Sequence, residues 1–245
     1  MSTRIKFFLG HLLVSVILAL LVIAIVFFVW YPFPLAKAVG VTQIFLMLIV
    51  IDVIIGPLLG LLVYKEGKKT LKMDLVIIIL IQLAALSYGV FSIAQGRPVW
   101  IVYTNIDRFE LVRNIDVEKD NIAIASQEYK KTNWLRPHIV ALKKEKTIDE
   151  QNKRLFNDLS NGISAAMYPE RYTTFSESKL DLQRYTKNLK ELKEYNSDPI
   201  VSEILKEYPS ANSWLPLKAT AVDMVVLINK EKAEVVKIVD LRPWN

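Results

Sequence analysis

Three long apolar runs dominate the first part of this 245-residue chain. They cover residues 7–30, 41–63 and 73–95. As a helix, the first run of 24 residues rises about 36 Å, whereas the hydrocarbon core of a bilayer is about 30 Å thick. We therefore predict that residues 1–96 form a region of three transmembrane helices and that residues 97–245 form a soluble domain.

The first run has an alternative interpretation as a cleaved signal peptide, because Ala36-Lys37-Ala38 resembles a cleavage site. The hydrophobic core of a signal peptide has only about 7–15 residues, however. The length of the run therefore favours a retained anchor.

Basic residues predict the orientation, since they concentrate on the cytoplasmic side of a membrane protein. They precede the first run and fill the loop 64–72, while the connection 31–40 carries only Lys37; the others are Arg4, Lys6, Lys65, Lys68, Lys69 and Lys72. We expect the N-terminus and the loop 64–72 in the cytoplasm. Residues 97–245 then lie in the periplasm, with the anchor in a bacterial inner membrane.

The composition excludes several classes of site. The net charge of +6 divides into +4 for residues 1–96 and +2 for the soluble part (24 basic minus 22 acidic residues), which gives no basic surface for nucleic acid. The chain has no cysteine and two histidines, and only Gly162 lies well inside the soluble part. We therefore expect no metal, no cofactor and no phosphate-binding glycine loop. We also find no catalytic residues.

The soluble part alternates strand-like and helix-like segments. We predict strands at 98–104, 109–113 and 137–142, partial helix at 116–131, and helices from Thr147 to 160, over 178–195 and from Asp198 to 208. The segments 219–228 and 233–241 predict a C-terminal β-hairpin. The fold class is thus a three-helix transmembrane anchor followed by an α+β domain with an antiparallel sheet.

One face of the second span carries an unusual group of residues. Asp52, Gly56 and Gly60 are spaced by four residues and therefore share a helix face, and Pro57 removes one backbone donor there. Small residues at this spacing let another helix approach closely. The face is either a packing surface around a buried carboxyl group or a docking point for the transmembrane helix of another protein.

Residues of the third span that lie at about the same depth in the membrane as Asp52 are its possible partners. The candidates at a similar depth are Gln82, Ser87 and Tyr88. Nearer the cytoplasmic side, His11 and Asp74 could pair, or Asp74 could simply complement a helix N-terminus.

Two groups in the soluble part are candidate contacts. Tyr168, Tyr172 and Phe175 surround Arg171 and belong either to the core or to a partner-binding surface, where Tyr and Arg are enriched. Arg97 and Arg108 flank the first predicted strand, and both could pair locally or bind lipid headgroups. His138 we interpret as a packing or surface residue.

Several segments in order resemble the TfpX/TfpZ family of type IV pilin accessory proteins. They are residues 51–59 (IDVIIGPLL), 69–74 (KTLKMD), Gln82 with Tyr88-Gly89, 97–99 (RPV), 107–109 (DRF), 214–217 (WLPL) and 241–244 (LRPW). The resemblance implies an inner-membrane accessory protein that helps one type IV pilin to be stabilised or assembled. The resemblance implies no catalytic residue.

The hypothesis that follows is a non-enzymatic, pilin-specific chaperone or assembly factor. It binds a pilin and membrane lipid, and a homo-oligomer is compatible with it. The alternatives are an envelope enzyme that modifies pilin or cell-wall polymer, and a periplasmic sensor. The sensor is disfavoured because the cytoplasmic loop 64–72 is too short to fold.

Overall fold

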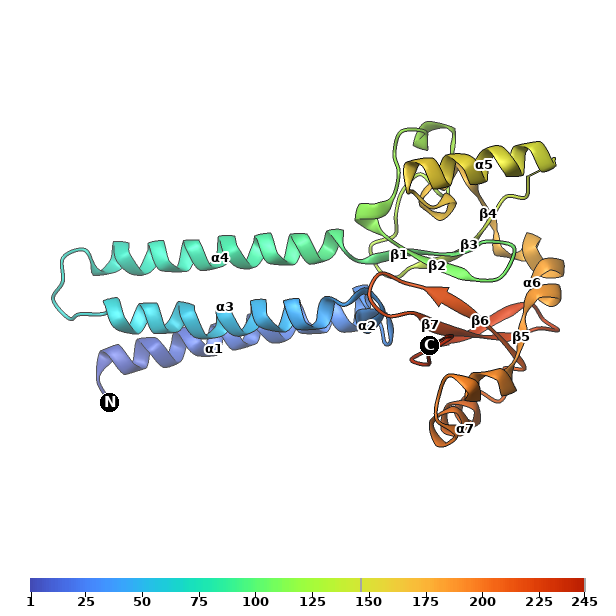
Figure 1. Cartoon of the computed structure of the whole chain (residues 1–245). Helices are drawn as coiled ribbons and strands as arrows, with labels where there is room; N and C mark the ends of the chain where they lie inside the picture. Colours follow the sequence, from blue (N-terminus) through green and yellow to red (C-terminus); the bar gives the residue numbers. More distant parts are fainter. Residues whose placement is uncertain (146, 245) are drawn as a thin grey trace. The chain divides into compact units, whose positions relative to one another are not determined.

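Two compact units make up the chain in a computed structural model that describes residues 1–145 and 147–244 (Figure 1). The first unit comprises residues 1–36 and 40–96. The second comprises residues 37–39 together with the chain from Arg97 onward.

The first unit consists of three long helices. α1 (Thr3–Ala24) continues as a π-helix (Ile25–Trp30); after a short α2 (Leu35–Val39) come α3 (Val41–Val63) and α4 (Leu71–Gln95). All three are long and apolar enough to cross a membrane, which confirms the prediction of three long apolar helices. α3 packs against both α1 and α4.

The second unit is built on one mixed sheet of eight strands. They are β1 (Pro98–Tyr103), β2 (Phe109–Arg113), β3 (His138–Leu142), β4 (Tyr172–Thr174), β5 (Lys187–Asn188), β6 (Ser213–Lys218), β7 (Met224–Asn229) and β8 (Glu234–Val239). Their order is β4-β3-β1-β2-β6-β7-β8, and β5 pairs with β6. β7 and β8 pair antiparallel, with Asn229 opposite Glu234.

The α+β class is confirmed, but the sheet is not purely antiparallel. β1 pairs with β3 and β2 pairs with β6 in parallel. A parallel pair needs a long crossover connection. The residues between β1 and β3, which include β2, and those between β2 and β6 supply such connections.

The helices of the second unit are α5 (Ile148–Asn161), α6 (Lys179–Tyr185) and α7 (Asp198–Glu207). As predicted, the Thr147 hydroxyl caps α5 by accepting from the Glu150 amide at 3.2 Å, and Gly162 ends it in the left-handed region at φ 65°. The cap residue of α7 is Ser197, one position before the predicted Asp198.

The prediction of one helix over residues 178–195 is wrong. α6 ends at Tyr185, and β5 and a 3₁₀-helix (Leu189–Glu194) follow. Asn188 breaks the helix: its side chain accepts from the Lys190 amide at 2.9 Å, and its carbonyl accepts from the Trp214 indole at 2.9 Å. A tertiary contact thus overrides a helical pattern. The segment 116–131 holds only short 3₁₀ turns, Asn114–Asp116 and Ile122–Ile124.

Among the described residues, the core of this unit includes two apolar clusters. One surrounds Trp100 and Tyr172, and the other surrounds Trp214 and Leu192. These four side chains are at most 2% exposed. Large buried side chains therefore stabilise the sheet on both sides of β2 in the strand order.

Candidate functional site

A polar cluster lies inside the helical unit and draws on all three long helices. Its centre is Gln82 of α4, whose amide nitrogen donates to the Ser15 hydroxyl at 3.0 Å and to the Asp52 main-chain carbonyl at 3.1 Å. The Gln82 amide oxygen lies 2.9 Å from Nε2 of His11. Because this oxygen can only accept, Nε2 of His11 carries the proton in this arrangement.

The glycines of α3 make room for this cluster. A Cβ atom added to Gly56 would lie 2.0 Å from Oε1 and 2.3 Å from Cδ of Gln82. A Cβ atom added to Gly60 would lie 3.1 Å from Cε1 of Phe7 and 3.3 Å from Nδ1 of His11. The face that carries Asp52 and the two glycines is therefore occupied by helices of the same chain.

The structure brings together part of the predicted membrane site. Asp52, Gly56, Pro57 and Gly60 are all buried in the helical unit, with Asp52 8% exposed. Gln82, one of the candidate partners, contacts Asp52: its amide nitrogen donates to the main-chain carbonyl of Asp52.

Other predicted partners lie elsewhere. The Tyr88 side chain is 74% exposed, and Ser87 is exposed too, so neither contacts Asp52 in the structure. The possible pairing of His11 with Asp74 is not seen: Asp74 lies 2.6 Å from Nζ of Lys68 and accepts from Thr70, at the start of α4. The interpretation of Asp74 as a helix N-terminal residue therefore holds.

A groove between α1 and α4 opens beside the polar cluster. It has a volume of 580 Å³, and its lining is Phe7, Gly10, His11, Val14, Ser15, Leu18, Ile79, Gln82 and Leu83. The walls are apolar, and the polar atoms come from the His11–Ser15–Gln82 contacts. A Cβ atom added to Gly10 would meet nothing within 4 Å, so the α1 wall is open at this point. The groove suits an acyl chain or an apolar helix.

The second unit has a polar cleft of 620 Å³ that contains the predicted contact Arg108. Nε of Arg108 lies 3.5 Å from Oε1 of Glu110, and Nε of Arg113 lies 2.7 Å from Oδ2 of Asp116. The Ser164 hydroxyl donates to Oε2 of Glu110 at 2.5 Å and accepts from the Ala166 amide, so it caps a 3₁₀ turn. The charges in the cleft are largely paired with one another, and no histidine lines it.

The residues of the predicted aromatic contact surface differ in burial: Tyr172 lies in the core, whereas Tyr168 and Arg171 lie at the surface. Tyr172 is fully buried, donates to the Ala166 carbonyl and packs edge-on against Trp100 at 5.4 Å, and its burial raises the pKa of its phenol. It is a core residue and not a surface contact. Tyr168 and Arg171 remain half-buried at the surface, with the guanidinium 4.9 Å from the centre of the Tyr168 ring. His138 is held by Asn133 at 2.7 Å and packs against Trp100, which agrees with its interpretation as a packing or surface residue.

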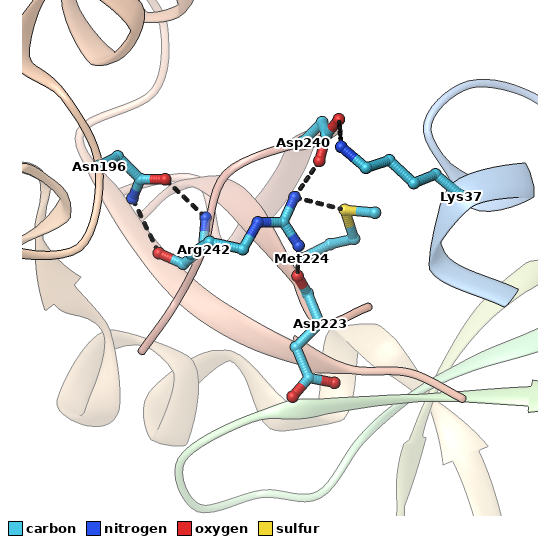
Figure 2. A network of polar contacts seen from close by, with 6 residues as sticks. All are labelled: Lys37, Asn196, Asp223, Met224, Asp240 and Arg242. Atoms are coloured by element: carbon cyan, nitrogen blue, oxygen red, sulfur yellow. Dashed lines mark hydrogen bonds and ion pairs between the residues drawn. The ribbon is translucent and has the colours of Figure 1, made fainter. Parts of the chain in front are cut away.

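The C-terminal turn forms a network that sequence reasoning missed (Figure 2). The Arg242 guanidinium donates to the Asp223 carbonyl and to the Asp240 carboxylate, while the Asn196 amide bonds both main-chain groups of Arg242, at 2.7 and 2.8 Å. The Asp240 carboxylate also binds Nζ of Lys37 at 2.7 Å. The only sequence signal was a basic residue between an apolar strand and a proline, which many turns share.

Residues 37–39 belong to the second unit through further contacts. The Ala38 carbonyl accepts from the amides of Ala221 and Val222, at 2.9 and 3.2 Å. The connection between α1 and α3 is therefore held in the same unit as the chain that follows α4.

No cluster of three or more metal-ligating side chains occurs within residues 1–145 and 147–244. The described arrangement thus consists of a membrane groove, a charge-paired cleft and a fixed C-terminal turn.

Comparisons with known proteins agree on one kind of relative. The family model described as Fimbrial assembly protein FimB matches residues 1–40. The fimbrial assembly proteins of serogroups I and E1 of Dichelobacter nodosus are each 30% identical over 181 residues, which cover 73% of this chain and 70% of the relative. The protein of serogroups C1 and C2 is 36% identical over 114 residues, or 46% of this chain and 86% of the relative. No solved structure matches.

Proposed function

The chain belongs to the family of fimbrial assembly proteins, and from this premise we propose that it is a non-catalytic accessory protein for one type IV pilin. In this proposal it sits in the bacterial inner membrane with its N-terminus in the cytoplasm and residues 97–245 in the periplasm. It binds the pilin and supports pilin stability or pilus assembly. The resemblance to the TfpX/TfpZ family belongs to the same proposal.

The groove between α1 and α4 is the observation that carries the proposal. Apolar walls alone would not select a protein helix, because lipid tails are as apolar as the helix. Gly10 lets a partner helix approach α1 closely, and His11 and Ser15 offer polar groups to it. A lipid tail gains nothing from either feature. The segment that the family model matches, residues 1–40, includes the whole α1 wall.

The glycine face of α3 has an indirect role in this proposal. Gly56 and Gly60 hold Gln82, Phe7 and His11 in place, and these three residues line the groove. The pilin helix therefore contacts the groove rather than the glycines themselves. Asp52, Pro57 and Tyr88 are not contacts of the pilin in this version.

A second candidate contact is the cleft that holds Arg108. Its paired charges suit a polar segment of the pilin head, which could exchange partners with them. Tyr168 and Arg171 offer a further surface pair. The alternatives of an enzyme and a sensor receive no supporting observation from this geometry.

In-cell photo-crosslinking tests the groove. A photoreactive residue at Val14, which lines the groove and is 56% exposed, is expected to capture the pilin. The matched control is Tyr88 on α4, which is 74% exposed and does not line the groove. Capture of pilin from position 14 and not from position 88 supports the proposal. Capture of lipid alone, or of a second copy of this chain, at position 14 overturns it.

A filling variant gives an independent readout. Gly10→Leu adds a side chain in open space, so the protein should accumulate normally while surface fimbriae decrease several-fold. Tyr88→Leu serves as the control and should leave fimbriae unchanged. Normal fimbriae in a stably inserted Gly10→Leu variant would contradict the groove as the binding site.

A further inference from the structure

Arg97 connects the membrane helix to the soluble unit in the sequence. α4 ends at Gln95, Gly96 is its cap, and Arg97 is the first residue of the second unit. Since α4 is long and apolar enough to cross the membrane, Arg97 lies within one or two residues of the membrane surface. Any side chain that packs on Arg97 must be close to that surface as well.

Two loop segments are held on Arg97. Its guanidinium lies 4.2 Å from the centre of the Trp134 ring and donates to the Asn133 carbonyl at 3.3 Å. Its main-chain carbonyl accepts from the Asn114 amide at 2.9 Å, and the Thr132 hydroxyl joins the two segments by donating to Oδ1 of Asn114 at 2.8 Å. Arg97 is only 2% exposed, because these two segments cover it.

The two segments expose large apolar side chains directly beside these anchored residues. Ile115 follows Asn114 and is 64% exposed, whereas Trp134 and Leu135 follow Asn133 and are 59% and 65% exposed. Oδ1 of Asn133 accepts from the Leu135 amide at 2.8 Å, which fixes the loop in this form.

The composition of this surface is that of a membrane interface. Tryptophan is enriched at the level of the lipid headgroups, and aliphatic side chains reach below that level. The next residue, Arg136, is exposed, as is Lys131 on the other side of the loop. Basic side chains at this level bind the phosphates of anionic lipids.

We propose that Ile115, Trp134 and Leu135, here called the interfacial patch, dip into the bilayer surface beside the end of α4, with Arg136 bound to anionic headgroups. Lipid is the occupant because the patch is anchored on the residue that leaves the membrane helix. The patch would hold the soluble unit at the membrane surface, where an accessory protein can meet a partner that is still inserted in the bilayer. This inference does not depend on which partner the protein assists.

Spin labelling of the full-length protein tests the patch directly. The chain contains no cysteine, so a single introduced cysteine carries the only label. Leu135→Cys places the label in the patch, and Leu180→Cys places it on α6, where the native side chain is 76% exposed. The protein is reconstituted in phosphatidylcholine vesicles with and without phosphatidylglycerol. Collision with oxygen, which partitions into lipid, is compared with collision with a water-soluble nickel chelate.

The expected result is an oxygen-to-nickel accessibility ratio several-fold higher at position 135 than at position 180. A water-like ratio at both positions overturns the proposal. Low accessibility to both reagents at position 135 also overturns it, because a protein surface rather than lipid then covers the patch.

Three further variants test the role of Trp134 and of the anionic headgroups separately. Trp134→Ala, made in the Leu135→Cys background, removes the ring that stacks on Arg97 and should lower the ratio at position 135 toward that at position 180, whereas Trp134→Phe should retain most of it. Phosphatidylglycerol should raise the ratio at position 135, and Arg136→Gln should abolish this increase. If phosphatidylglycerol has no effect in the parent protein, the binding of anionic headgroups is refuted.

Discussion

Replacement of Gly56 by alanine tests whether the membrane helices are held together by the polar cluster. The added Cβ atom would lie 2.0 Å from Oε1 and 2.7 Å from Nε2 of Gln82, far inside the normal contact distance. The amide must therefore leave its position. Its hydrogen bonds with His11, Ser15 and the Asp52 carbonyl are then broken.

The expected destabilisation follows from these hydrogen bonds. Side-chain hydrogen bonds between membrane helices contribute about 0.6 kcal/mol each on average, and up to about 1.7 kcal/mol. Three of them amount to about 2 kcal/mol. Alanine regains up to about 1 kcal/mol of helix propensity on the scale measured in water. We therefore expect Gly56→Ala to lower the free energy of unfolding by about 1–2 kcal/mol.

The assay is reversible unfolding of the purified full-length protein in mixed micelles, with SDS as denaturant and helical circular dichroism as signal. Gly10→Ala is the matched control, since a Cβ atom added there meets nothing within 4 Å. It should be neutral or slightly stabilising.

A double-mutant cycle isolates the steric cause. In the Gln82→Ala background the amide is absent, so Gly56→Ala should no longer destabilise. The reasoning is refuted if Gly56→Ala behaves like Gly10→Ala, or if the effects of Gly56→Ala and Gln82→Ala simply add.

Three further predictions concern the second unit. Trp214→Ala empties the centre of a fully buried cluster, so thermal unfolding should show a loss of about 3–5 kcal/mol. Lys37→Ala should cost less than about 1 kcal/mol in the same assay, because the lysine of the ion pair with Asp240 is 56% exposed; a larger loss would contradict this estimate. Burial raises the pKa of Tyr129 from 10.0 to about 12, so the unfolded chain releases this proton first and the unfolding free energy should fall as the pH rises from 10 to 12. Tyr129→Phe should reduce this pH dependence in denaturant titrations, and an unchanged slope would refute the assignment.

The membrane helices could be predicted from the sequence because a bilayer leaves the backbone few choices. A chain in hydrocarbon must satisfy every backbone hydrogen bond internally, so an apolar run of sufficient length becomes a helix. The predicted second span 41–63 matches α3 residue for residue. α1 begins earlier than predicted, at Thr3, because polar residues outside the hydrocarbon can extend the helix and Ser2 caps it.

The polar cluster could be predicted only in part. Depth along the helices gave Gln82, Ser87 and Tyr88 as candidate partners of Asp52, and the structure shows the contact with Gln82. Depth is a single coordinate, however, and contact also depends on how each helix is rotated about its axis. That rotation brings His11 to Gln82, and the sequence alone offers no means to choose this pairing over one with Asp74.

The soluble unit shows where local patterns fail. Leu182, Leu189 and Leu192 have helical spacing, and Leu182 and Leu192 are fully buried. Leu182 belongs to α6, however, whereas Leu189 and Leu192 belong to the 3₁₀-helix that follows β5. Their chain is broken at Asn188 by contacts with distant residues such as Trp214. The parallel pairs of the sheet likewise depend on which strands come together, and no local pattern encodes that choice.

In the proposed mode of binding, the same residues stabilise the helical unit and line the binding groove. The Gln82 amide uses both its nitrogen and its oxygen within the chain, so it can stiffen the groove but has little bonding capacity left for a partner. Selectivity for a partner helix then comes from shape, above all the open wall at Gly10, and from the polar groups of His11 and Ser15. Substitutions at Gly56 or Gly60 should therefore weaken fimbrial assembly through a distorted groove, in proportion to the stability they cost. Gly10→Leu should weaken assembly without that cost, and this difference distinguishes a groove held by the glycines from a partner bound on the glycine face.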